Sequence, residues 1–501
     1  MNGCNFDLEK YERRYADWRK RFDEYGSSPV IKGRVYYVSS DGNDANSGTS
    51  PDFPWKTLSK VSSFALREGD GVLFRRGDVF RGFIKAKPGV TYAAYGEGKR
   101  PELFGSPRDL ADKNIWRRYK ETDNLWELKG GFPDCGTLVF NGGESHAFKQ
   151  TPSYINGRFV CRNAPEILFD PEKHLGNLDF VWLSEFRMTE APSKGERFPV
   201  PDVGRDVLGS LILRCDEGNP GEVFSSIEAL TFGHMFEIGS SDNVRIDGLA
   251  IKYVGTHAIG AFGICIKGLK ITNCEIGWIG GCIQNYSGTD PNNPADKRGS
   301  VTRYGNGVEI YGGCDGYTVS DCYIYEVYDA GITHQVSTDG TEYHLKNIVY
   351  RNNLVERCTY GIEYFLEKTR DTANDEKSLI SNCLIENNII RFSGYGWGSQ
   401  RPDKSTPAAI KGWNHNNSAK RFVVKNNILD RSSERLVHMI ADRDTDRAEM
   451  SGNVYVQTFG GKLGLYGKNT PENLSDVTVK DDFSKRIKEY LKDETGTGIT
   501  V

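Results

Sequence analysis

The feature that most constrains the fold is a short motif that recurs through the second half of the sequence. In each copy an Asn or Asp lies three residues before an aliphatic residue, as in ITNCEI, VSDCYI, YRNNLV, IENNII, VKNNIL and SGNVYV. The polar positions are Asn273, Asp321, Asn352, Asn387, Asn426 and Asn453. Their spacing varies from 27 to 48 residues, which is irregular for helical repeats but expected of stacked coils with loops of different length. The motif therefore predicts a solenoid in which Asn amides hydrogen-bond from one coil to the next.

A second recurring segment predicts strands with an inner and an outer face; it reads GVEI, GITHQ, GIEYF, AIKGW and LVHMI. Because side chains alternate along a strand, the aliphatic members Val308, Ile332, Ile362, Ile410 and Val437 would point inward. The outward column would then be Glu309, Thr333, Glu363, Lys411 and His438. An alternative register uses GCIQN (281–285) as the strand and places Gln284 in the column. We predict an all-β fold, a right-handed single-stranded parallel β-helix with a short N-terminal helix and inserted loops.

The chain divides into three parts. Residues 1–34 begin with a highly charged amphipathic segment and are predicted to form an N-terminal helical cap. Residues 35–480 are predicted to form the β-helix, because short β-branched and aromatic runs alternate with Gly, Asp and Asn turns. Within this part, residues 106–235 lack the repeat and are interpreted as irregular insertions or a small lobe. Residues 481–501 are expected to form a C-terminal helix or tail.

Charge and hydropathy argue against several kinds of partner. The formal net charge is −4, so neither nucleic acid nor an anionic membrane is expected as a partner. No segment approaches the ~20 continuous apolar residues of a membrane-spanning helix, and the charged N-terminus has no secretory signal pattern. The 11 cysteines, several at apolar strand positions, favour reduced thiols and a cytoplasmic location, with a secreted mature form as the alternative. No cofactor or metal site is expected, and the oligomeric state is left open.

Two stretches resemble a known superfamily. The opening block YYVSSDGNDANSGTSPDFPWKTL, with GDGVLFRRGDVFRG after it, is similar to the start of many pectate-lyase-like β-helix proteins. Residues 303–335, RYGNGVEIYGGCDGYTVSDCYIYEVYDAGITHQ, resemble coils of its carbohydrate-active members. The resemblance implies a right-handed parallel β-helix that acts on saccharides, as a glycoside hydrolase, polysaccharide lyase or uronate epimerase. The sequence departs from polygalacturonases, which have a paired-Asp strand and a Gly-His-Gly motif, and from the Ca²⁺-binding pectate and alginate lyases.

Three acidic residues are candidates for catalysis. Glycoside hydrolysis needs one protonated carboxyl group and one ionised carboxylate flanking the scissile bond. Glu309 and Glu363 would point outward two coils apart, with ~9.6 Å between their backbones, so their carboxyls can reach the separation of either inverting or retaining enzymes. Asp329, on the coil between them, could push their pKa values apart. The alternative is that both glutamates are solvated on an exposed sheet face and that Asp329 caps a turn.

A further set of residues is predicted to contact the substrate: Arg303, His334, Tyr364, Lys411 and Trp413. Arg303 could clamp an acid group, and Trp413 could stack on a sugar ring or pack in the core. Lys411 could hold a substrate carboxylate or form a salt bridge with a neighbouring glutamate. His334 follows the outward Thr333, so an inward, buried position is its alternative.

Three functions are compatible with these residues. The leading one is hydrolysis of glycosidic bonds in oligo- or polysaccharides by paired carboxylates, because the outward column holds more acid than base. A polysaccharide lyase or uronate epimerase would instead use Lys411, His334 or a tyrosine to remove a proton beside a uronate carboxylate. A non-catalytic carbohydrate-binding solenoid would show aromatic stripes without converging acids. The fold alone does not choose among them.

Overall fold

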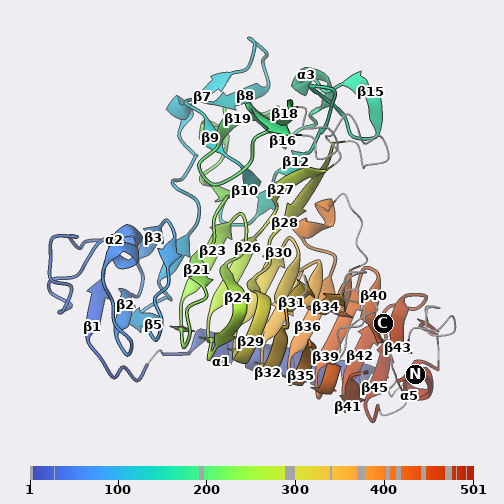
Figure 1. Ribbon diagram of the computed structural model, residues 1–501. Helices are drawn as coiled ribbons and strands as arrows, with labels where there is room; N and C mark the ends of the chain where they lie inside the picture. Colours follow the sequence, from blue (N-terminus) through green and yellow to red (C-terminus); the bar gives the residue numbers. More distant parts are fainter. Residues whose placement is uncertain are drawn as a thin grey trace.

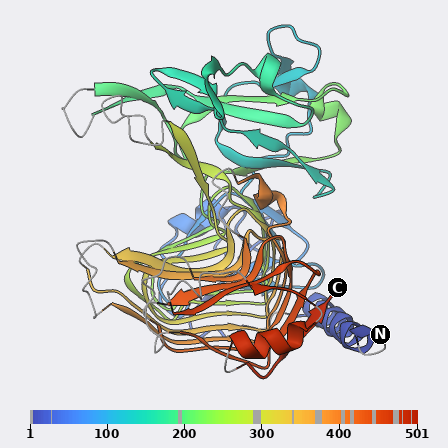
Figure 2. The ribbon, with the colours of Figure 1, turned by 90° about the vertical axis from the view of Figure 1, so that its right-hand side faces the viewer.

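The chain folds as a parallel β-helix, which confirms the predicted fold class (Figure 1). The computed structural model describes residues 4–26, 29–190, 197–287, 299–338, 341–368, 378–401, 407–412, 419–441, 447–468, 477–480, 482–491 and 494–501. Most coils contribute one strand to each of three faces, and the strands of each face pair in parallel from coil to coil. Seen from the C-terminal end, the coils stack behind one another (Figure 2), and buried apolar side chains fill the space that they enclose.

The three faces are continuous parallel ladders. The first face contains β4 (Ile84–Lys85), β21 (Phe236–Gly239), β24 (Ile259–Lys267), β29 (Val308–Ser320), β31 (Ala330–Thr338), β34 (Tyr360–Lys368), β37 (Ala408–Gly412), β40 (Arg435–Ala441) and β43 (Lys462–Lys468). The second contains β1 (Val35–Val38), β2 (Gly71–Arg75), β5 (Thr91–Tyr95), β22 (Arg245–Asp247), β25 (Lys270–Thr272), the second half of β29, β32 (His344–Arg351), β35 (Leu379–Glu386), β38 (Ala419–Lys425) and β41 (Glu449–Ser451). The third contains β3 (Val79–Arg81), β6 (Glu102–Phe104), β23 (Ala250–Val254), β26 (Glu275–Ile279), β30 (Tyr323–Val327), β33 (Leu354–Glu356), β36 (Ile389–Ser393), β39 (Ile428–Ser432), β42 (Val454–Gln457) and β45 (Thr497–Thr500).

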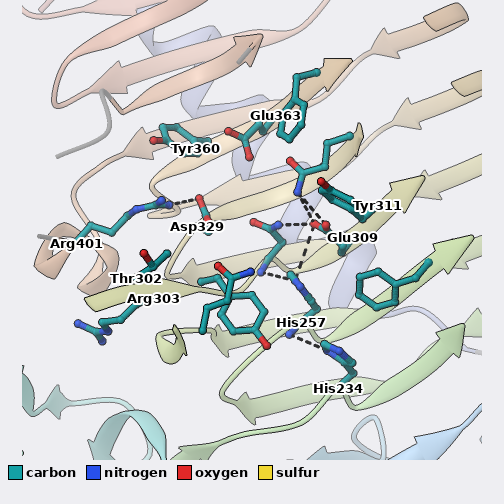
Figure 3. Close-up of a pocket in the computed structure, with 16 residues that line it drawn as sticks. His234, His257, Thr302, Arg303, Glu309, Tyr311, Asp329, Tyr360, Glu363 and Arg401 are labelled. Carbon is teal, nitrogen blue, oxygen red and sulfur yellow. Dashed lines mark hydrogen bonds and ion pairs between the residues drawn. The ribbon is translucent and has the colours of Figure 1, made fainter. Parts of the chain in front are cut away.

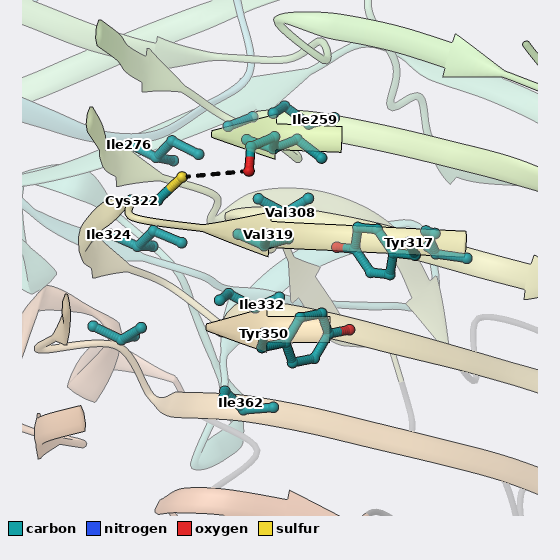
Figure 4. Close-up of a cluster of buried hydrophobic side chains, with 14 of the residues drawn as sticks. Ile259, Ile276, Val308, Tyr317, Val319, Cys322, Ile324, Ile332, Tyr350 and Ile362 are labelled. Atoms are coloured by element: carbon teal, nitrogen blue, oxygen red, sulfur yellow. Dashed lines mark hydrogen bonds between the residues drawn. The ribbon is translucent and has the colours of Figure 1, made fainter. Parts of the chain in front are cut away.

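The interior is filled by stacked aliphatic columns (Figure 4). The predicted inward column pairs in register from coil to coil and is fully buried: Val308, Ile332, Ile362, Ile410 and Val437. β-Branched side chains suit this arrangement, because they pack well against their neighbours on a pleated surface. The alternation that buries this column also directs the next residue of each strand outward. The packing of the core therefore determines which residues lie on the outer face.

The predicted amide ladder exists, but it lies one residue later than expected in most coils. The expected positions Asn273, Asp321, Asn352, Asn387 and Asn426 have φ values of 53 to 57°. They form the corner between two faces, where asparagine and aspartate tolerate the left-handed conformation better than other side chains. The residue after each corner turns into the core, so the buried ladder is formed by Asn353, Asn388, Asn427 and Asn453.

The ladder runs in one direction and ends at a carboxylate. Each side-chain amide donates to the Oδ1 of the next Asn at 2.9 to 3.0 Å. The Nδ2 of Asn453 donates to the buried Glu494 at 2.8 Å, and its backbone N–H donates to the other oxygen at 3.1 Å. Because an ionised carboxylate only accepts hydrogen bonds, Glu494 ends the row of donors without leaving one unpaired.

The N-terminal helix α1 (Cys4–Asp23) does not cap the end of the solenoid, as expected for residues 1–34, but lies along its side. Its Tyr11 and Trp18 pack on the third face, and their polar atoms bond to Asp430 and to the carbonyl of Asn352, each at 2.6 Å. The helix therefore braces several coils at once, because its aromatic residues are spaced to contact successive strands. The C-terminal helix α5 (Phe483–Tyr490) instead buries Phe483 and Ile487 in the main core.

Residues 116–214 include a separate β lobe that rises from the solenoid (Figure 1). Its main sheet is built from β7 (Trp116–Arg118), β8 (Leu125–Leu128), β9 (Phe132–Pro133), β12 (Phe148–Gln150), β16 (Asp179–Ser184) and β19 (Leu208–Arg214). The lobe has its own apolar cluster, to which Ile283 and Val301 of the solenoid's hairpin contribute. That hairpin, β27 (Cys282–Ser287) with β28 (Ser300–Tyr304), joins the two parts. No helix in the described ranges is long and apolar enough to cross a membrane.

Candidate active site

The predicted outward column of the first face is confirmed. Glu309 is in register with Thr333, Glu363, Lys411 and His438 on successive coils. The alternative register is wrong, because the GCIQN segment belongs to β27, which pairs antiparallel with β28 instead of entering the parallel ladder. Gln284 therefore lies at the edge of the first face, on the hairpin.

A cleft of about 430 Å³ lies over this column (Figure 3). Its floor comes from β24, β29, β31 and β34, and one wall comes from the hairpin that leads to the lobe. The lining residues are His234, His257, Phe262, Gln284, Thr302, Arg303, Tyr304, Asn306, Glu309, Tyr311, Asp329, Gln335, Tyr360, Glu363, Phe365 and Arg401. All three predicted catalytic carboxyl groups are among them.

Glu309 is held by two side-chain amides. Asn306 donates from Nδ2 to Oε2, and Gln335 donates from Nε2 to both oxygens, at 2.8 and 3.1 Å. Burial raises the pKa of Glu309 to about 7, although the hydrogen bonds from Gln335 and Asn306 oppose this rise by favouring the ionised form. Asn306 is itself fixed, because its Oδ1 accepts the backbone N–H of Ala330 at 2.7 Å.

Glu363 has a different environment two coils away. It is 6% exposed, and burial together with the negative charge of Asp329 raises its pKa to about 8. The positive charges of Lys411 and Arg401 act in the opposite direction. Among the described residues, the side-chain amides that hold Glu309 have no counterpart hydrogen-bonded to Glu363. The two glutamates therefore lie in different environments, Glu309 between two amide donors and Glu363 among charged neighbours.

Asp329 lies between the two glutamates and is bound by an arginine. Arg401, directly after the 3₁₀ turn η3 (Trp397–Gln400), donates from Nη1 to Oδ1 of Asp329. Figure 3 shows Glu363, Asp329 and Glu309 surrounding one space, with Arg401 approaching from the side of Asp329. This ion pair fixes the third carboxylate and supplies positive charge next to Glu363.

Two predicted substrate contacts are wrong because they point into the core. His334 is fully buried, lies 2.8 Å from the hydroxyl of Tyr350 and stacks on Tyr364 at 5.7 Å between ring centroids. Tyr364 is in register with His334 and belongs to the same apolar core. Strand alternation explains both, since each residue follows an outward residue. Burial lowers the pKa of His334 to about 3, so this imidazole is neutral.

The other predicted contacts have mixed outcomes. Arg303 lines the cleft, but its guanidinium donates to the carbonyls of Gly281 and Gly136 at 2.7 and 2.8 Å, so it fastens the hairpin to the lobe. Lys411 is 1% exposed, with its Nζ 4.0 Å from the centre of the Tyr360 ring, and it is not among the residues lining the cleft. Trp413 lies outside the described residues.

Several lining residues were missed at the level of sequence. His234 and His257 stack at 5.0 Å, and burial lowers the pKa of His234 to about 4 and that of His257 well below its usual value. The Nδ1 of His257 accepts the backbone N–H of Asn306 at 2.9 Å, which places the imidazole proton on Nε2. The sequence offers one weak signal for this pair: the chain has just 8 histidines, so each of them could have been considered as a site residue.

The outer face carries a second column that alternation could have predicted. Phe262, Tyr311, Gln335 and Phe365 lie in register, and Tyr311, Gln335 and Phe365 each follow a residue of the Glu309 column by two positions. Gly260 occupies the Glu309 column on the preceding coil. A β-carbon there would lie 3.0 Å from the Phe262 ring and 3.2 Å from the His234 ring, so glycine leaves room for both.

Within the ranges that the structure describes, His, Cys, Asp and Glu side chains form no group of three or more that could hold a metal ion.

Comparisons with known proteins give short or distant similarities. No protein-family model matches the sequence. A segment of 82 residues is 45% identical to a lacto-N-biosidase of Bifidobacterium longum subsp. longum, which covers 14% of this chain and 5% of that much longer protein. Among solved structures, a GH136 lacto-N-biosidase from Eubacterium ramulus is similar with a TM-score of 0.42 at 13% identity, over 99% of this chain and 70% of that chain.

Two further solved structures are similar at the same level. A protein described as a glycoside hydrolase has a TM-score of 0.44 at 10% identity, over 90% of this chain and 100% of that chain. Pectate lyase Pel9A has a TM-score of 0.40 at 11% identity, over 86% of this chain and 72% of that chain. Similarity at this distance does not carry over an activity.

Proposed function

We propose that the protein is a glycoside hydrolase that cleaves glycosidic bonds in oligo- or polysaccharides. The observation that carries the proposal is the convergence of Glu309, Asp329 and Glu363 in one cleft, where two of the three carboxyl groups have raised pKa values. Burying such groups without a function is unfavourable, and strongly perturbed carboxyl groups in a cleft are typical of acid–base catalysis.

The environments of the two glutamates support different roles for them. Glu363 has the higher pKa, about 8, and acts as the general acid that protonates the departing glycosidic oxygen. Glu309, with a pKa of about 7, accepts amide hydrogen bonds that favour its ionised form, and it acts as the general base. Asp329 and Arg401 lie beside the acid, where the carboxylate supports the protonated form of Glu363.

The reaction follows from this assignment. Glu309 takes a proton from a water molecule, the water oxygen forms a bond to the anomeric carbon, and the bond from that carbon to the leaving oxygen breaks. Glu363 gives its proton to the leaving oxygen, and the two groups then exchange protons with solvent. Carboxyls that stay over strands two coils apart, ~9.6 Å, lie near the ~6.5–9.5 Å separation that leaves room for this water, whereas retention would require them to lean to within ~5.5 Å of each other. The expected stereochemical outcome is inversion.

The lyase and epimerase alternatives lose two of the three bases considered for removing a sugar proton, because Lys411 is buried against Tyr360 and His334 lies in the core. The third, a tyrosine, is still present in the lining as Tyr304, Tyr311 and Tyr360, and the absorbance of unsaturated products tests it. The arginines that line the cleft contact Asp329 or main-chain carbonyls. The non-catalytic solenoid is disfavoured as well, because the cleft combines aromatic residues with converging acids.

A substrate screen tests the proposal. Purified protein is incubated with neutral and uronate-containing oligosaccharides while reducing ends and the ultraviolet absorbance of unsaturated products are followed in parallel. New reducing ends without unsaturation are expected, and the anomeric form of the first product, followed by NMR, reports inversion. Unsaturated products would show a lyase and contradict the paired-carboxylate mechanism.

Two variants link the activity to the cleft. Glu309→Gln and Glu363→Gln are each expected to lower kcat by at least ~100-fold, the typical contribution of a general acid or base. Glu342→Gln is the matched control, because Glu342 pairs with His344 in an exposed ion pair and does not line the cleft. Retained activity in both cleft variants would contradict the assignment.

A further inference from the structure

The second outward column exposes aromatic surface directly beside the acids. Phe262 is 37% exposed and Tyr311 is 39% exposed, and both line the cleft on neighbouring strands. In-register neighbours of a parallel ladder lie ~4.8 Å apart, so two such rings present a continuous apolar surface of about the size of one sugar ring. The ring of Phe262 contacts that of His234, with 5.5 Å between centroids, which steadies its orientation.

Gln335 stands next to this surface and has a polar atom without a partner. Gln335 is 8% exposed, its Nε2 serves both oxygens of Glu309, and its buried Oε1 has no hydrogen-bond partner among the described residues. The amide is oriented by Glu309, because the carboxylate requires the donor end. A buried acceptor without a partner is unfavourable, so a ligand that donates a hydrogen bond to this atom would be stabilised there.

The charges around this surface select against an acidic ligand. Arg401 is engaged by Asp329, and Arg303 by two carbonyls, with its guanidinium also 4.5 Å from the centre of the Tyr328 ring. The two neighbouring histidines are neutral, because burial lowers their pKa values. A sugar carboxylate placed on these rings would lie beside Glu309, whereas Arg303, a lining arginine that is bonded to carbonyls and not to an acid, lies on the opposite side of the cleft from Tyr311 (Figure 3).

We propose that Phe262, Tyr311 and Gln335 form a subsite for one uncharged pyranose ring, which stacks on the two aromatic rings and donates a hydroxyl hydrogen bond to Oε1 of Gln335. This inference rests on the proposed hydrolase function and specifies its substrate class. Gln335 is in this scheme a positioning residue as well, since the amide that accepts from the sugar also holds Glu309. Occupation of the subsite thus fixes the orientation of the base.

Binding experiments test the subsite without requiring turnover. The probes are methyl β-D-glucopyranoside and methyl β-D-galactopyranoside, each compared with its C6-carboxylate counterpart, and binding is followed by saturation-transfer NMR on the full chain. At least one neutral glycoside is expected to bind, and its carboxylate counterpart at least about tenfold more weakly. Phe262→Ala and Tyr311→Ala should each weaken binding by about tenfold, the equivalent of ~1.4 kcal/mol for one ring contact.

A matched control and an independent readout separate this proposal from the hydrolase proposal. Phe459→Ala removes a ring that is 64% exposed and does not line the cleft, and it should leave binding unchanged. Equal binding of the carboxylate probes, absence of binding by both neutral probes, or unchanged affinity in both aromatic variants would overturn the subsite. If the neutral probes bind through these rings but no substrate is hydrolysed, the subsite stands and the hydrolase proposal fails. If a substrate is hydrolysed with an unchanged KM in Tyr311→Ala, the hydrolase proposal stands and the subsite fails.

Discussion

The contact between Asn306 and Glu309 allows a quantitative test of the proposed base. With pKa values of about 7 for Glu309 and about 8 for Glu363, the productive form, base ionised and acid protonated, reaches ~60% near pH ~7.5. Asn306→Ala removes a hydrogen bond to a charged acceptor, which is worth ~1.5–3 kcal/mol and raises the pKa of Glu309 to ~8–9. If both groups then titrate near ~8, the productive form reaches only ~25%, near pH ~8.

The assay is the pH dependence of kcat/KM for any substrate found in the screen. Asn306→Ala is expected to move the acidic limb upward by about one pH unit and to lower the maximum at least about twofold. Asn124→Ala is the control, because Asn124 makes the same kind of amide–carboxylate bond, to Asp216 at 2.7 Å, on the surface of the lobe. An acidic limb that stays in place, or moves to lower pH, would refute the assignment of Glu309 as the base.

Three further predictions follow from other contacts. Arg401→Met removes a positive charge that lowers the pKa of Glu363, so the basic limb of the same profile should move to higher pH; a downward movement would contradict Glu363 as the acid. Asn427→Ala breaks a buried rung of the ladder and should lower the free energy of unfolding by ~2–4 kcal/mol in urea titrations. Asn426→Gly, at a left-handed corner, should change the free energy of unfolding by less than ~1 kcal/mol, and equal effects of the two substitutions would contradict the ladder. Tyr11→Phe removes the hydrogen bond to Asp430 and should raise amide exchange in the N-terminal helix, measured by mass spectrometry; unchanged exchange would show that the apolar contacts alone hold the helix.

The sequence was sufficient for the parts of the fold that depend on strand periodicity. Val308, Ile332 and Ile362 repeat an aliphatic position in a common frame, and their inward stacking follows from alternation alone. The same rule placed Glu309 and Glu363 on the outer face. It also directs Tyr364 inward, because that residue follows the outward Glu363, so the prediction of Tyr364 as a substrate contact was inconsistent with the strand pattern.

Other features depend on geometry that the sequence does not display. In the NN pairs both residues are asparagines, so composition does not tell which one takes the corner and which one enters the core. Arg401 reaches Asp329 from 72 residues away through the turn at η3, and His257 reaches Asn306 from the preceding coil. These contacts depend on the paths of the loops between strands. The repeated motif aligns the strands with one another but does not predict which loop residues lie beside them.

The direction of the amide ladder has a consequence for the length of the molecule. Because every rung both accepts and donates along the same axis, a coil with its own asparagine could be added between Asn353 and Asn453 while the row stays continuous. A coil added after Asn453 would meet Glu494. This carboxylate accepts a hydrogen bond from Asn453 but has no N–H group that could donate to a further rung. Glu494 therefore ends the amide ladder. Between Asn353 and Asn453, by contrast, the number of coils can change without interrupting the ladder.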